Sequence, residues 1–74
     1  MAQAITVLAS IENAEGGRCV DIFARLDGTF GFEEYRRDPE EGRWSHAGNY
    51  GHRVYATRAE AEAAARAAVA WMRG

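Results

Sequence analysis

An Asp-Gly pair at positions 27 and 28 constrains the fold more than any other feature of this 74-residue chain. Residues 19–26 before the pair and residues 29–37 after it both alternate between apolar and polar side chains. Alternation with a period of two is typical of strands. Asp-Gly between two such runs is a strong hairpin signal, because glycine accepts the positive φ of a tight turn. The sequence therefore predicts an antiparallel hairpin.

Two further strands are predicted on either side of this hairpin. Residues 4–11 alternate around β-branched side chains, and the glycines at 16 and 17 separate this run from the next strand. The segment Asp38–Gly42 has the residues that a turn prefers at its first, second and exit positions. Trp44 after it is a candidate start of a short strand. We interpret residues 45–51 as loop and predict the last short strand at residues 53–56.

The C-terminal segment is predicted to be a helix over residues 58–72. Thr57 and Glu60 have the spacing of a capping box, and alanine, the best helix former, dominates the residues that follow. At 100° per residue one face collects Ala61, Ala64, Ala65, Ala68, Trp71 and Met72. We therefore predict a single α+β domain over residues 1–74. It would be a three- or four-stranded antiparallel meander with this helix packed on one face.

The alternation also assigns side chains to the two faces of the sheet. Val20, Ile22, Ala24 and Leu26 share an apolar face, whereas Cys19, Phe23 and Tyr35 belong to the other face, with Trp44 or Tyr55 as further candidates. Gly31 predicts a twist, a bulge or a place where an aromatic ring lies over the backbone. Glu34 follows Phe32 onto the apolar face, where a carboxylate needs a cation. We predict that this cation is Arg25 or Arg53.

A resemblance to a known group of proteins rests on two segments. Residues 20–42 contain the letters FGFEEYRRDP, and residues 53–61 read RVYATRAEA. Together they resemble an uncharacterised family of small proteobacterial proteins. The resemblance spans most of the chain after residue 20 and implies an antiparallel meander with a C-terminal helix. It implies no activity, so no catalytic residue is transferred from it.

The charge balance bears on the class of partner. The chain has a net charge of −2 and a pI of about 5.6, and all nine of its basic residues are arginine. A nucleic-acid binder usually presents a basic face, because phosphate neutralisation dominates its affinity. A single cysteine fits a reducing compartment, and the apolar run near the N-terminus is too short to span a membrane. We expect a cytoplasmic protein without membrane contact.

Few residues suggest chemistry of their own. His46 and His52 could bind a metal, but their spacing matches no zinc motif. Cys19 could act as a nucleophile with either histidine behind it, but no neighbouring feature predicts a lowered thiol pKa. We therefore predict no enzyme activity, no metal and no cofactor. A small enzyme or metal site using Cys19 or the two histidines is the third interpretation.

An interaction module is the first interpretation. Its function would be to bind a protein partner, or a second copy of the chain, through the sheet face opposite the helix. The candidate partner surface consists of Phe23, Arg25, Tyr35, Arg37, Trp44 and Tyr55. The alternative is single-stranded nucleic acid, because aromatic side chains can stack on bases while arginines contact phosphates. The excess of acidic residues makes this alternative the weaker one.

Overall fold

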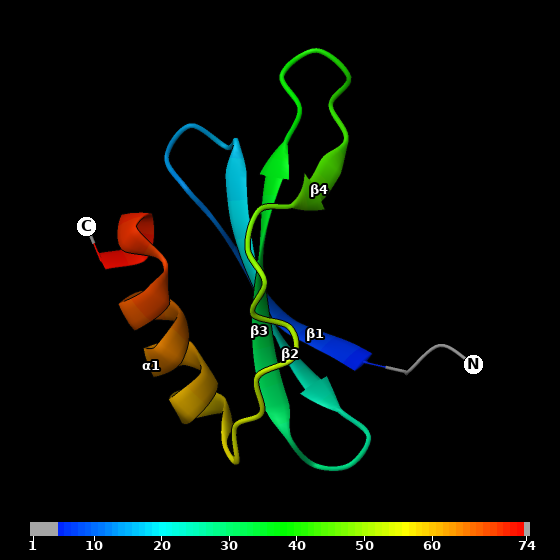
Figure 1. Cartoon of the computed structure of the whole chain (residues 1–74), viewed down its shortest axis with the longest axis vertical. Coiled ribbons are helices and arrows are strands. Elements are labelled where there is room, and N and C mark those ends of the chain that lie inside the picture. The colour runs from blue at the N-terminus through cyan, green and yellow to red at the C-terminus, as the bar shows by residue number, and fades with distance from the viewer. Residues whose placement is uncertain (1–4, 74) are drawn as a thin grey trace.

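Four antiparallel strands and one helix make up the computed structural model, which describes residues 5–73 (Figure 1). The strands β1 (Ile5–Glu12), β2 (Arg18–Arg25), β3 (Phe30–Arg37) and β4 (Trp44–His46) lie in the sheet in chain order. The helix α1 (Arg58–Ala68) follows, and a 3₁₀ turn, η1 (Ala70–Arg73), comes after it. The predicted α+β meander is confirmed. Residue 4 of the first predicted strand lies outside the described residues.

The Asp-Gly turn between β2 and β3 forms as the sequence predicts. Gly28 has a φ of 88°, and its N–H donates to the carbonyl of Arg25 at 3.1 Å. The Asp27 carboxylate accepts from the hydroxyl of Thr29 at 2.6 Å and from its N–H at 3.0 Å. These bonds stabilise the ionised form and lower the pKa of Asp27. The prediction for Leu26 was wrong, because this residue belongs to the turn and is 85% exposed.

The turn between β3 and β4 is also confirmed. Asp38 Oδ1 accepts the N–H groups of Glu40 and Glu41, each at 2.8 Å, and Gly42 closes the turn with a φ of 73°. The two bonds lower the pKa of the Asp38 carboxyl. The Asp38 carboxylate is therefore occupied by bonds within the turn, and the turn returns the chain alongside β3.

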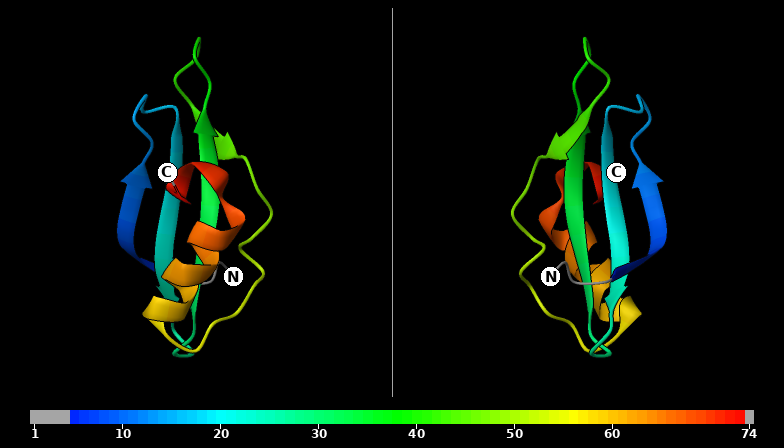
Figure 2. Two further views of the ribbon diagram at one scale, coloured as in Figure 1. Left: turned by 90° about the vertical axis from the view of Figure 1, so that its left-hand side faces the viewer. Right: turned by 90° about the vertical axis from the view of Figure 1, so that its right-hand side faces the viewer.

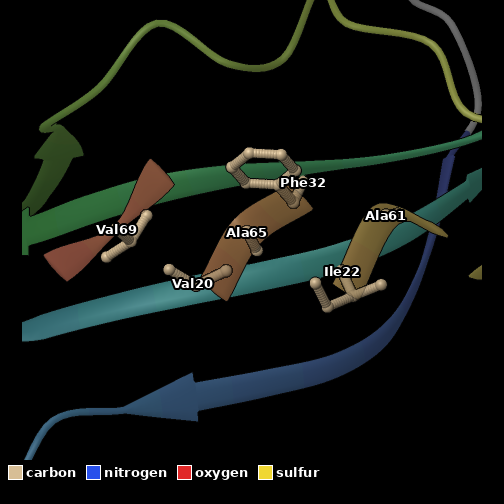
Figure 3. Close-up of a cluster of buried hydrophobic side chains, with 6 residues drawn as sticks. All are labelled: Val20, Ile22, Phe32, Ala61, Ala65 and Val69. Atoms are coloured by element: carbon tan, nitrogen blue, oxygen red, sulfur yellow. The ribbon is translucent and has the colours of Figure 1, made fainter. Parts of the chain in front are cut away.

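The core lies between α1 and the two central strands. Val20 and Ile22 come from β2 and Phe32 from β3, and all three side chains are fully buried against Ala61, Ala65 and Val69 (Figure 3). The helix contributes small side chains, so its backbone lies close to the sheet and the strands supply the bulk. The backbone of α1 lies over β2 and β3, and β1 adds Ala9 and Ile11 to the margin of the core (Figure 2).

The helix begins as predicted and ends earlier. The N–H of Glu60 donates to the Thr57 hydroxyl at 3.1 Å, as in a capping box. The Glu60 carboxylate reaches one residue further back than the cap and accepts from the N–H of Ala56 at 3.1 Å. The prediction that the helix continues to residue 72 was wrong. Val69 is extended, with φ −104° and ψ 107°, and the chain tightens into η1. This bend lets the Trp71 indole reach the sheet, as described below.

The strand predicted at residues 53–56 does not form. Tyr55 alone makes a bridge to Phe30, with N–H to carbonyl distances of 2.8 and 3.0 Å in the two directions. The strand beside β3 is β4 instead, which begins at the candidate Trp44 and pairs with residues 35–37. After β4 the connection, residues 47–57, runs along the edge of β3 (Figure 1). Side chains of the sheet bind the backbone of this connection at residues 50, 51 and 53.

Candidate functional site

The sheet face opposite α1, called the open face below, is not covered by another element of residues 5–73 (Figure 2). The strand register places the open-face residues in cross-strand rows. One row runs through Ser10, Asp21 and Glu33, and the next through Glu12, Cys19, Tyr35 and His46. Arg37 pairs with Trp44 at one end of the face, and Val7, Phe23 and Gly31 form a row toward the other end.

A shallow hollow of about 300 Å³ lies on this face, lined by Ser10, Glu12, Cys19, Asp21, Tyr35 and Trp44. Two of the predicted surface residues, Tyr35 and Trp44, are its aromatic walls. The lining has two carboxylates and no basic residue, so the hollow is negatively charged at neutral pH. An aromatic and acidic lining of this kind favours a cation over a phosphate.

The floor of the hollow contains the cysteine. The Ser10 hydroxyl donates to Asp21 Oδ1 at 2.8 Å, the Cys19 thiol donates to the same oxygen at 3.3 Å, and the two donors lie 3.0 Å apart. Burial raises the pKa of the Cys19 thiol, and the bond to the Asp21 carboxylate acts in the same direction. The thiol is thus held protonated as a hydrogen-bond donor, which opposes the role of a nucleophile.

Glu33 lies beside the hollow and anchors the connection that follows β4. Glu33 is 5% exposed, and its carboxylate accepts from the N–H groups of Tyr50 at 3.3 Å and Gly51 at 3.0 Å. His46 Nδ1 lies 3.6 Å from Glu33 Oε1, and the His46 ring is 4.9 Å from that of Tyr35. Sequence reasoning missed this role of Glu33. The glycine-rich stretch after β4 was the available signal, because its free amides need acceptors.

Arg25 and Phe23 form the other end of the open face. The Arg25 guanidinium donates to the carbonyls of Gly51 at 2.7 Å, Arg53 at 3.1 Å and Phe30 at 3.0 Å. Its Cζ lies 5.0 Å from the centre of the Phe23 ring. Arg25 is therefore bound to the connection rather than free for a partner, and Phe23 is buried beneath it.

Gly31 lies directly below these two side chains. A Cβ built at Gly31 would lie 2.7 Å from Cζ of Phe23 and 2.8 Å from Nη2 of Arg25. Of the three interpretations of this glycine, the aromatic ring over the backbone is the one that the structure confirms.

Tyr55 and Glu34 belong to the other side of the sheet. The Tyr55 ring packs against the core with its centre 6.0 Å from that of Phe32, so its assignment to the partner surface was wrong. Glu34, 6% exposed, accepts from Trp71 Nε1 at 2.9 Å and from Arg18 Nη1 at 3.2 Å. The predicted pairing with Arg25 or Arg53 was wrong, because Arg25 faces the open side and Arg53 lies over the Tyr50 ring.

The metal candidates do not come together into a ligand set. His46 contacts Tyr35 and Glu33, whereas His52 is exposed on the connection. Across residues 5–73 no group of three His, Cys, Asp or Glu side chains is arranged to hold a metal ion.

In the same part of the chain, no helix is long and apolar enough to cross a membrane.

No protein-family model matches the chain, and no curated protein or solved structure matches it significantly. The resemblance of residues 20–42 to small proteobacterial proteins therefore stays an expectation from the sequence, and it assigns no role to any residue. Only the open face therefore bears on function.

Proposed function

We propose that this protein is a small non-enzymatic interaction module that binds a protein partner through the open face. The observation that carries the proposal is the hollow, where the exposed Trp44 and the half-buried Tyr35 stand beside two carboxylates on an uncovered sheet. Tryptophan and tyrosine are enriched in protein interfaces, because they bury a large area at a low cost in conformational entropy. The single free cysteine supports a reducing, cytoplasmic location as part of the proposal.

The lining of the hollow points to the kind of side chain that it binds. Glu12 and Asp21 supply negative charge, and the rings of Tyr35 and Trp44 supply the electron-rich faces that attract cations. An arginine from the partner fits both features, because its planar guanidinium stacks on aromatic rings and binds carboxylates. We therefore propose a partner segment that inserts an arginine into the hollow.

The nucleic-acid alternative has less support. Three arginines already have partners: Arg18 binds Glu34, Arg25 binds carbonyls of the connection, and Arg53 lies over Tyr50. The hollow itself would repel a phosphate backbone through its two carboxylates. The third interpretation, an enzyme using Cys19, is opposed by the raised pKa of the thiol.

The test is a titration of the ¹⁵N-labelled protein with a short acetylated and amidated Gly/Ser peptide that contains one arginine. We expect shifts of the amide resonances of Tyr35 and Trp44 and of the Trp44 indole, and these shifts weaken with salt. The same peptide with citrulline replacing arginine leaves these resonances unchanged. Trp44→Ala removes the response, whereas Leu26→Ala, which truncates an exposed side chain at the β2–β3 turn, retains it.

A single-stranded oligothymidine is the competing probe. If it shifts the open-face resonances and the arginine peptide does not, the nucleic-acid alternative replaces the proposal. If neither probe shifts any open-face resonance, the proposed role of the hollow is wrong.

A further inference from the structure

β1 is an edge strand of the sheet, and most of its residues are exposed. The helix lies over β2 and β3, and Ala9 and Ile11 of β1 pack against the core, whereas the other six residues of β1 are exposed (Figure 2). Its outer edge pairs with no strand of residues 5–73. Three large apolar side chains stand out from it: Ile5 is 47% exposed, Val7 50% and Leu8 36%.

The sequence of β1 offers little protection for such an edge. Residues 5–11 contain neither a charged residue nor a proline, the two devices with which proteins commonly block an edge strand. The other lateral edge of the sheet differs, because β4 and the connection after it cover the edge of β3. A long, neutral, apolar edge with free backbone groups is a template for pairing with another strand.

We propose that β1 pairs in antiparallel fashion with β1 of a second copy, which joins the two sheets into one across a twofold axis. The bulge in β1 favours a second copy as the partner. The register with β2 shifts between Val7 and Ala9, so Val7 pairs with Phe23 and Ala9 with Ile22. Leu8 is the extra residue of the bulge. A regular partner strand would therefore have to pair one of its residues with two residues of β1 at this point.

A second copy carries the same shift at the same place. With the axis between Leu8 and Ala9, Val7 lies opposite Ser10, Thr6 opposite Ile11 and Ile5 opposite Glu12. The register with β2 assigns the members of each pair to one face of the sheet, as antiparallel pairing requires. The pairing is thus one-to-one on both sides of the bulge.

The charges are compatible with this arrangement. Glu12 is the only charged residue of β1, and in the proposed register it lies opposite the neutral Ile5 of the other copy. The two Glu12 side chains stand at opposite ends of the seam, so no like charges meet. The exposed apolar side chains of both copies gather along the seam, and both helices lie on one side of the joined sheet. This inference does not depend on the proposed binding of arginine in the hollow.

The first test measures mass and amide protection on the unaltered protein. Sedimentation equilibrium is expected to give twice the 8.2 kDa mass of one chain at high concentration, with dissociation on dilution. Amide hydrogen exchange within residues 5–11 is expected to slow as concentration rises, while exchange at Tyr35 and Trp44 on the open face does not change. A mass of one chain at every concentration overturns the proposal, and so does protection confined to the open face.

The second test uses a matched pair of variants. Leu8→Lys places two like charges next to the twofold axis and is expected to give a monomer. Leu26→Lys makes the same exchange at an exposed leucine of the β2–β3 turn and is expected to leave the dimer intact. A dimer that survives Leu8→Lys contradicts the edge assignment. If Leu8→Lys fails to fold, as judged by circular dichroism, the exchange experiment on the unaltered protein decides. Folded monomeric Leu8→Lys should still bind the arginine peptide, which separates this proposal from the proposed function.

Discussion

Gly31 shows how a single residue shapes the open face, because Phe23 and Arg25 occupy the space where its side chain would be. An added Cβ would lie under 3 Å from atoms of both neighbours, so Gly31→Ala must displace a ring and a guanidinium that are themselves held in place. We expect a loss of about 1–3 kcal/mol in the free energy of unfolding, as for other overpacked sites. Urea denaturation followed by circular dichroism measures it.

The matched control for this substitution is Gly17→Ala. Gly17 has no atom within 4 Å of an added Cβ and does not have a positive φ. We expect its effect to stay within about 0.5 kcal/mol. Equal losses at the two positions would mean that the space above Gly31 is not the cause.

Cys19 gives the protein a stability that depends on pH. Burial raises the pKa of its thiol in the folded state, so between the unfolded and folded pKa values the folded protein binds the proton more tightly. The resulting stabilisation is complete below the pKa of an unfolded thiol, about 8.5. It is lost as the pH rises through that value toward the folded pKa. Urea midpoints measured from neutral to alkaline pH should therefore fall.

Cys19→Ala isolates this contribution, because the pKa of Tyr35 is also raised by burial and its loss of stability begins at higher pH. The difference in unfolding free energy between the unaltered protein and Cys19→Ala should shrink with rising pH. A difference that stays constant would show that the thiol does not titrate as described.

Among the elements, the connection between β4 and α1 depends most on side chains of the sheet. Arg25 donates to two of its carbonyls, at Gly51 and Arg53, and Glu33 binds two of its amides. We expect Arg25→Lys to lose about 1–3 kcal/mol of stability, because an ammonium cannot reproduce the fork of the guanidinium and the part-buried carbonyls of Phe30 and Gly51 lose donors. Amides around Tyr55 should exchange faster. Arg36→Lys, at an exposed position of β3, should behave like the unaltered protein.

Local chemistry decides the elements that the sequence predicts well. The two hairpin turns and the start of α1 depend on bonds between residues a few positions apart, such as those of Asp27, Asp38 and Thr57. The end of α1 depends on a distant residue, since Trp71 turns toward Glu34. Residues 53–56 likewise meet distant residues, because the Arg53 carbonyl accepts from Arg25 and Tyr55 bridges to Phe30.

The candidate face was predictable in part. Strand alternation correctly placed Phe23 and Tyr35 opposite the helix, and Trp44 joins them through the turn at Asp38. Tyr55 lies outside any regular strand, so alternation could not assign its side. The partner of Glu34 was within reach of the same reasoning, because Arg18 shares the face of Val20, which pairs with Glu34, whereas Arg25 does not.

At the scale of the whole molecule, the proposed dimer makes stability depend on concentration. Association stabilises the folded state by mass action, because unfolded chains do not pair in this way. The urea midpoint of the unaltered protein should rise with protein concentration, and that of Leu8→Lys should not. A midpoint independent of concentration in both proteins would contradict dimerisation coupled to folding.

The connection that runs along β3 also sets a limit on assembly. A sheet that is bare at both ends can add copies without end, which is how fibres grow. Here residues 47–57 and the short β4 cover the edge of the sheet at β3, so β1 is the one long edge at which a copy could be added. When two copies pair through β1, neither copy keeps a free β1 edge. The connection along β3 thus limits the proposed assembly to a dimer and prevents growth into a polymer.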